Sequence, residues 1–95
     1  MSASREDLMA RLRQEADGCY PWSNAPGDVY GEHSHGYEKI LYCVAGSITF
    51  TLPDRRIELG PGDRMVLPPG TRHGAIVGPG GCTCIEGRGR NMAAR

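Results

Sequence analysis

The 95-residue sequence has no net charge, because its 11 basic side chains are balanced by 11 acidic ones. This balance removes any general electrostatic attraction to nucleic acid or to an anionic membrane surface, so we expect neither as a partner. No apolar run is long enough to span a bilayer, and the N-terminus lacks the basic start and apolar stretch of a signal peptide. The sequence therefore predicts a protein of the cytoplasm.

The chain is also too short for two independent hydrophobic cores, which predicts a single domain. Without a secretory signal, its four cysteines are expected to be reduced thiols. Cys82 and Cys84 form a C-x-C pair, whereas zinc-thiolate sites typically use C-x-x-C pairs. We therefore interpret the cysteines as small apolar packing residues.

Residues 4–18, "SREDLMARLRQEADG", have the pattern of one short helix. Ser4 can cap its start with Asp7 three residues later, and Gly18 can end it. Leu8, Leu12 and Ala16 form a narrow apolar stripe, enough to lie against a neighbouring surface but not to build a core. This pattern predicts that residues 1–18 are a helical appendage.

Beyond the helix, glycine and proline separate short runs of apolar and β-branched residues. "SITFTL", residues 47–52, alternates apolar and polar side chains as a strand with one buried face does. Short strands with such turns predict an all-β, single-domain sandwich or barrel over residues 19–88, followed by a flexible tail at 89–95. Unprotected strand edges and the helix stripe predict a homodimer.

Three histidines are the residues most suggestive of chemistry. His33 and His35 are separated by one residue, so on a strand they point to the same face. His73 follows the turn formed by Pro68, Pro69 and Gly70. A single histidine is more often exposed or hydrogen-bonded within the protein, but three that converge in a closed sheet match a common catalytic metal arrangement.

The same stretches resemble the two sequence motifs of the cupin superfamily. Gly27, His33, His35 and Gly46 follow the order and spacing of the first motif. The second motif is the more specific one, and its four fixed positions are occupied by Gly62, Pro68, Gly70 and His73. The resemblance extends from Trp22 to Glu86, which is most of the chain.

The resemblance implies a jelly-roll barrel that holds one divalent transition metal: Fe, Mn, Ni, Zn or Cu. Imidazole ligands suit all of these metals, so the sequence does not choose among them. It also implies a small-molecule ligand in the barrel. The aromatic residues near the first motif, Trp22, Tyr30 and Tyr37, can line the mouth of such a pocket or serve as packing.

Two positions depart from the family pattern. Val77 replaces the usual asparagine of the second motif, and Lys39, the only lysine, replaces the usual metal-binding glutamate. Either a local bulge turns Glu38 inward as a ligand, or Glu38 faces outward and the metal site consists of His33, His35 and His73. We favour the three-histidine site, because Leu41 and Cys43, which share a strand face with Lys39, suit a barrel interior.

With three histidines alone, Lys39 is a candidate catalytic residue. Aimed into the pocket, its ammonium group can bind a substrate carboxylate, and aimed outward it is an ordinary solvated side chain. Two kinds of function remain open. The first is a metal-dependent enzyme (a dioxygenase, isomerase or lyase) acting on a small polar molecule, and the second is a non-catalytic binding or sensing module.

Overall fold

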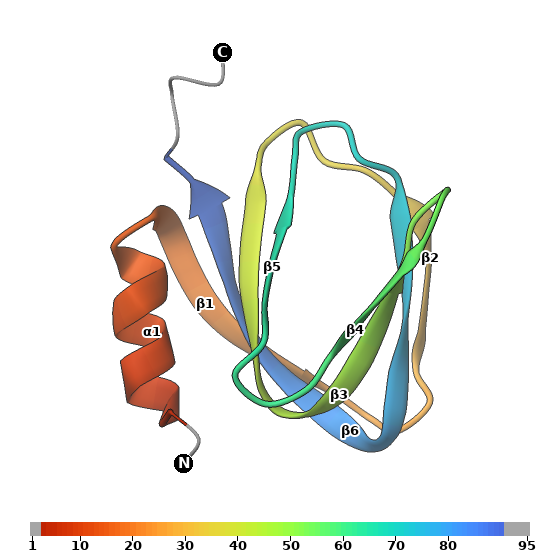
Figure 1. Cartoon of the computed structure of the whole chain (residues 1–95), viewed down its shortest axis with the longest axis horizontal. Coiled ribbons are helices and arrows are strands. Elements are labelled where there is room, and N and C mark those ends of the chain that lie inside the picture. The colour runs from red at the N-terminus through yellow and green to blue at the C-terminus, as the bar shows by residue number, and fades with distance from the viewer. Residues whose placement is uncertain (1–2, 91–95) are drawn as a thin grey trace.

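The computed structural model describes residues 3–90 and contains one short helix followed by six strands (Figure 1). The predicted all-β single domain with a short N-terminal helix is thereby confirmed. The elements are α1 (Arg5–Arg13), β1 (Ala16–Asn24), β2 (Val29–His33), β3 (Lys39–Thr51), β4 (Arg56–Leu59), β5 (Arg64–Leu67) and β6 (His73–Gly89).

Two long strands, β3 and β6, pair with each other along most of their length and bend partway. Residues 39–43 of β3 pair with residues 84–88 of β6, and residues 48–51 pair with residues 74–77. The register shifts between these two segments, and Gly46 lies there with a φ of 72°. A Cβ on Gly46 would lie 2.0 Å from the carbonyl oxygen of Gly81, so the strands can cross this closely only at a glycine.

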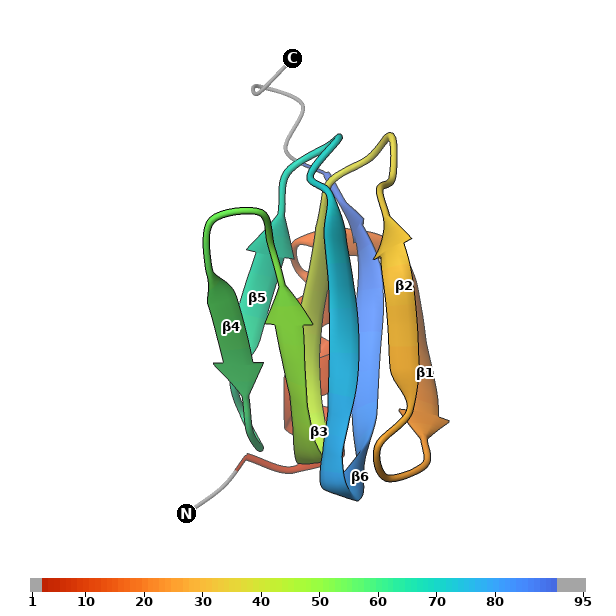
Figure 2. The ribbon, with the colours of Figure 1, turned by 90° about the vertical axis from the view of Figure 1, so that its right-hand side faces the viewer.

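The bend gives β3 and β6 a place in two sheets that face each other (Figure 2). In the first, which we call the helix-side sheet, the order is β1–β6–β3–β5. In the second, the far sheet, the order is β2–β6–β3–β4. The main core between the sheets includes Leu41, Cys43, Ile48, Phe50, Leu59, Met65, Leu67, Ala75, Val77, Cys82 and Cys84.

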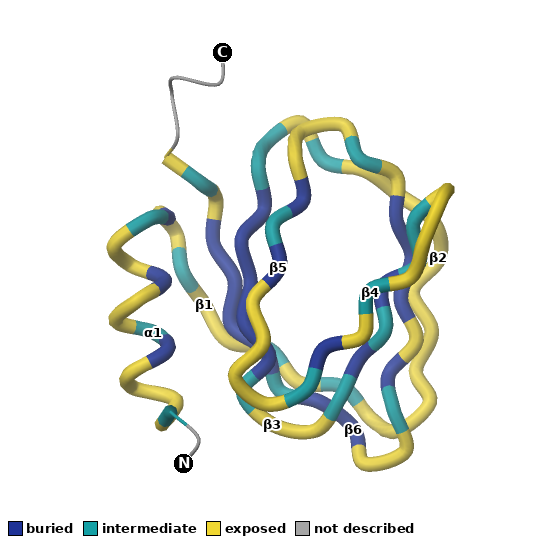
Figure 3. Tube along the Cα trace, viewed as in Figure 1, coloured by how far each residue is buried: buried dark blue, intermediate teal, exposed yellow. Residues whose placement is uncertain are grey.

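Helix α1 covers the outer surface of the helix-side sheet. The predicted cap is present, because the Ser4 side chain accepts from the Asp7 N–H and the Asp7 carboxylate accepts from the Ser4 N–H. Leu8 and Leu12 are 1% and 0% exposed and pack in a second core with strand residues that include Ile40, Tyr42 and Ile85. Figure 3 shows these buried turns of the helix facing the strands. The helix stripe is thus part of a core, which the sequence pattern underestimated.

The helix is shorter than the sequence predicted. It ends at Arg13, and β1 begins at Ala16 because Ala16 and Asp17 pair with Gly89 and Arg88 of β6. Strand β1 therefore begins before the predicted boundary between residues 18 and 19, and β6 extends past the one predicted between residues 88 and 89. Residues 91–95 of the predicted tail lie outside the described residues.

All four cysteines are free in the structure, and Cys43, Cys82 and Cys84 are buried in the main core. Their burial agrees with a packing role. No helix within residues 3–90 is both long enough and apolar enough to cross a membrane.

Candidate metal centre

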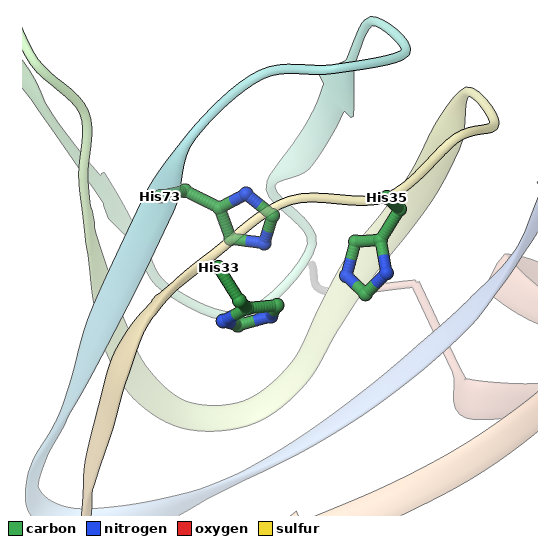
Figure 4. A group of neighbouring side chains, drawn as sticks. All are labelled: His33, His35 and His73. Atoms are coloured by element: carbon green, nitrogen blue, oxygen red, sulfur yellow. The ribbon is translucent and has the colours of Figure 1, made fainter.

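The three histidines come together at one end of the barrel, between the two sheets (Figure 4). His33 ends β2 and is paired directly with His73, which begins β6. His35 lies in the loop after β2, where its carbonyl oxygen accepts a hydrogen bond of 2.8 Å from the N–H of Gly70. The ring centres are 4.4 Å apart for His33 and His73, 4.9 Å for His33 and His35, and 5.3 Å for His35 and His73. The hydrogen bond between Gly70 and His35 therefore ties the turn of the second motif to the loop that carries His35 of the first motif.

The ring nitrogens are placed as those of metal-binding histidines usually are. One nitrogen from each ring lies within 4.8 Å of the others. The Nδ1 atoms of His33 and His73 are within hydrogen-bonding distance of the carbonyl oxygens of Gly31 (2.8 Å) and Thr71 (2.9 Å). Such backbone contacts fix the ring orientation and leave Nε2 free for a metal ion.

Two of these nitrogens lack a hydrogen-bond partner although they are buried: Nε2 of His35 and Nε2 of His73. Buried polar atoms without a partner are rare and costly in folded proteins. A divalent ion between the rings would satisfy both atoms, so the residues present fit a metal. Among residues 3–90, these histidines form the only group of three or more His, Cys, Asp or Glu side chains that is close enough to share an ion.

Electrostatics keep two of the imidazoles in the form that binds metal. Burial lowers the pKa of His35, and the positive charge of Lys39 lowers it further. Burial is also the main reason that the pKa of His73 is lowered. At neutral pH both rings are therefore uncharged and carry a lone pair, as metal coordination requires.

A cavity of about 270 Å³ opens beside the histidines. It is small for a ligand site, which restricts it to a small molecule. Its walls are largely aromatic, and all three aromatic residues singled out in the sequence contribute to them. The lining residues are Tyr20, Trp22, Tyr30, His33, His35, Tyr37, Lys39, Phe50, His73, Ala75 and Glu86.

Lys39 and Glu38 occupy different surfaces. Lys39 lines the cavity and is 9% exposed, on the same face of β3 as the core residues Leu41 and Cys43. Glu38 lies in a separate groove beside α1, where its carboxylate occupies the space that a side chain on Gly89 would need. Lys39 therefore faces the cavity beside the histidines, and Glu38 does not.

The carboxylate in the cavity is Glu86, which the sequence reasoning did not identify as a site residue. It is 5% exposed and accepts hydrogen bonds from the Tyr20 hydroxyl (2.9 Å) and the Trp22 indole N–H (2.7 Å). Burial, together with the bond to Glu86, raises the pKa of Tyr20 to about 12. Strand alternation in "CTCIEG" was the available signal, because Cys82, Cys84 and Glu86 share one face of β6.

The other position that departs from the motif is a core residue. Val77 is 2% exposed and packs in the main core. The apolar replacement of the usual asparagine therefore adds to packing between the sheets and does not reach the histidines' cavity.

Comparisons with known proteins identify a family and similar folds. A family model described as a cupin domain matches residues 22–89. Acireductone dioxygenase 4 of Arabidopsis thaliana is 45% identical over 51 residues, which are 48% of this chain and 27% of that protein. The chain thus spans about a quarter of the length of this relative.

Several solved structures are similar over most of the chain. KdgF from a Halomonas species has a TM-score of 0.64 and 26% identity, covering 81% of this chain and 72% of that one. The polyketide cyclase RemF from Streptomyces resistomycificus has a TM-score of 0.67 and 31% identity, covering 75% of this chain and 52% of that one.

Proposed function

The chain belongs to the cupin family, and on this basis we propose that it is a metal-dependent enzyme acting on a small polar molecule. His33, His35 and His73 would hold one divalent ion. The observation that carries the proposal is the pair of buried, unpartnered Nε2 atoms on His35 and His73 within the three-histidine cluster. The cavity beside the cluster supplies the space for a ligand.

Three neutral nitrogen donors leave coordination positions open, which is the arrangement of catalytic rather than structural sites. Bound there, a divalent ion would supply Lewis acidity, or oxygen chemistry if the ion is iron. The match to acireductone dioxygenases favours a dioxygenase over an isomerase or lyase. Imidazole donors suit Fe, Mn, Ni, Zn and Cu alike, so the identity of the metal has to be measured.

The chain's own residues would bind and orient the ligand. The aromatic walls exclude water from its apolar part, and Tyr30 is fixed by a hydrogen bond from its hydroxyl to the Asn24 side chain. Lys39 is the candidate catalytic group, because its ammonium faces the cavity from the helix-side sheet. There it can hold an anionic oxygen of the ligand or stabilise negative charge that develops during a reaction.

The metal site is tested by titrating divalent ions into the metal-stripped protein. Replacing any one of the three histidines by alanine removes one donor, so we expect the affinity to fall by about a hundredfold or more. Ser34→Ala, an exposed change between two of the histidines, is the matched control and should bind as the parent does. Equal affinity in the parent and all three histidine variants would overturn the proposal. Metal analysis of protein purified without chelators identifies the native ion.

One observation favours a second function, that of a binding or sensing module without turnover. Lys39 stands at the position where the family pattern has its anionic ligand, so the site departs from that pattern. The two functions are separated by incubating iron-loaded protein with small acids and following dioxygen and the acid. Consumption of dioxygen supports the dioxygenase, conversion of the acid without dioxygen supports an isomerase or lyase, and binding without either supports the module.

We also propose that the protein is a homodimer. Within residues 3–90, β1 and β2 pair only with β6, and β4 and β5 only with β3, so each leaves one edge open. Next to the open edge of β2, the paired residues Val29 and Ile76 are 71% and 47% exposed. An apolar pair beside an open edge is suited to a second copy of the same surface.

Light scattering at micromolar concentration tests the dimer. We expect Val29→Lys to give monomers and Gln14→Lys, the same change at an exposed site beside α1, to leave the dimer intact. A monomeric parent protein contradicts the proposal.

A cytoplasmic location, proposed because four free thiols persist best in a reducing compartment, is tested by cell fractionation.

A further inference from the structure

Glu86 is a buried carboxylate whose two oxygens are both engaged. Oε2 accepts from the Tyr20 hydroxyl, and Oε1 accepts from the Trp22 indole and lies 3.5 Å from Nζ of Lys39. Burying a carboxylate is costly unless it is hydrogen-bonded and paired with a cation, and here both conditions are met. With its oxygens occupied, Glu86 is set up to hold Lys39 rather than to bind the metal.

The position of the pair follows from the strand register. Leu41 of β3 is paired with Glu86 of β6, and Lys39 is paired with Arg88. Lys39 and Glu86 are therefore diagonal neighbours on the inner face of the helix-side sheet. Their side chains are 11% and 7% exposed, and the pair lines the cavity that His33 and His73 enter from the far sheet.

The Lys39 ammonium retains capacity to bind a further group. It carries three N–H donors, and among residues 3–90 its only polar contact is the 3.5 Å ion pair with Glu86. Arg88, the cation paired with Lys39 in the strand register, instead lies 4.3 Å over the ring of Tyr37. Lys39 is thus the cation that lines the cavity with donors to spare.

The charge of the site favours an anion. In the family pattern, a glutamate ligand would offset part of the charge of a divalent ion, but this chain has Lys39 there. Lys39 and Glu86 offset each other, and three neutral imidazoles leave the charge of the ion uncompensated. An incoming anion would supply the missing compensation.

We propose that the cavity binds a small carboxylic acid, with its carboxylate between the metal held by the three histidines and the ammonium of Lys39. Glu86 is a positioning residue that keeps the ammonium in the cavity. This inference rests on the proposed metal site and names the class of ligand that it takes. A phosphate is less suited, because phosphate sites usually converge several N–H donors or an arginine fork on the anion, and this cavity offers one ammonium.

The test uses the parent protein loaded with Co²⁺, whose visible spectrum reports ligands that reach the metal. Glycolate and glycolamide are matched probes, because they differ in charge but little in size, and inorganic phosphate is a third probe. We expect glycolate to bind at least about tenfold more tightly than glycolamide and phosphate. This comparison needs only the parent protein, so equal affinity for the acid and the amide overturns the inference without any variant. Preferred binding of phosphate also overturns it.

Variants locate the second contact of the carboxylate. On metal-saturated protein, Lys39→Met should weaken glycolate binding by about ten- to a hundredfold and leave glycolamide binding nearly unchanged. Arg55→Met removes a positive charge from an exposed site and is the matched control. Unchanged glycolate affinity in Lys39→Met shows that Lys39 is not the contact and overturns the inference.

The role of Glu86 is tested by a double-mutant cycle. Glu86→Gln removes a negative charge near the ligand, which favours glycolate binding in either background. It also lets the flexible stem of Lys39 turn toward solvent, which weakens glycolate binding only where Lys39 is present. The positioning role therefore predicts that Glu86→Gln is less favourable to glycolate binding in the parent than in the Lys39→Met background, by at least about threefold. An equal effect in both backgrounds overturns the positioning role.

A parent protein whose Co²⁺ spectrum never forms overturns the proposed function and this inference together, whereas intact metal binding without preference for the acid overturns this inference alone.

Discussion

Glu38 and Lys39 are consecutive residues whose side chains lie on opposite sides of the helix-side sheet, Glu38 beside α1 and Lys39 in the cavity. Sequence alternation left open which of the two would face the histidines. The barrel decides it through the neighbours of Lys39 on β3, since Leu41 and Cys43 fill the main core while Ile40 and Tyr42 pack under the helix. A shift of one residue in the register of β3 would place Ile40 and Tyr42 in the main core and Leu41 and Cys43 under the helix.

Replacing Lys39 by glutamate should raise metal affinity and lower the stability of the metal-free protein. The new carboxylate restores the anionic ligand of the family pattern, which should tighten binding by about tenfold or more. Without metal it would lie near Glu86, and two buried carboxylates repel each other. Metal titration and thermal unfolding measure the two effects. A variant that binds metal more weakly than the parent contradicts the prediction.

Replacing Glu38 by glutamine should leave metal affinity within about twofold of the parent, since a carboxylate outside the site contributes only a weak, screened interaction. The comparison with the histidine variants makes this result informative. If Glu38→Gln lost metal as severely as His33→Ala, Glu38 would be the fourth ligand, and the strand would have to bulge on binding the ion.

The metal-free protein should lose stability as the pH falls below about 6.5, the ordinary pKa of histidine. His35 and His73 have lowered pKa values when folded, so the unfolded chain takes up protons first and acid favours unfolding. Thermal unfolding temperatures measured at several pH values between about 8 and 5 report this loss of stability. The ion pair of Glu15 with Arg64 acts in a lower window, because the lowered pKa of Glu15 starts from 4.5. His35→Ala should reduce the sensitivity near pH 6, and an unchanged profile would contradict the assignment.

Replacing Leu12 by alanine should destabilise the whole protein by about 2–5 kcal/mol. Leu12 is fully buried between α1 and the helix-side sheet, and the change leaves a cavity there. Arg11→Ala, on the exposed side of the same turn, should cost less than about 0.5 kcal/mol. Urea unfolding provides both values. A small cost for Leu12→Ala would mean that the helix is the dispensable appendage that the sequence first suggested.

Much of the site could be predicted because it is local in sequence. His33 and His35 are close along the chain, and the turn before His73 has a strong signal of its own in Pro68 and Gly70. Glu86 could not be recognised in the same way. Its partners Tyr20 and Trp22 are more than sixty residues away, and only the pairing of β1 with β6 brings them to it.

The end of the helix shows the same limit of local signals. The pattern of residues 4–18 continues to Gly18, yet the chain leaves the helix after Arg13. Pairing of Ala16 with Gly89 gives those residues strand partners that a short terminal helix could not replace. Long-range pairing overrides local propensity here.

The dependence of both sheets on β3 and β6 has a consequence for synthesis on the ribosome. Among the described strands, β1 and β2 have no strand partner except β6, and β6 is the last of them to be translated. Until residues 73–89 emerge, β1 and β2 remain without this strand partner, and His33 has not yet paired with His73. The nascent chain therefore exposes the edges of β1 and β2 until β6 emerges, and the barrel and its three-histidine cluster form together only then.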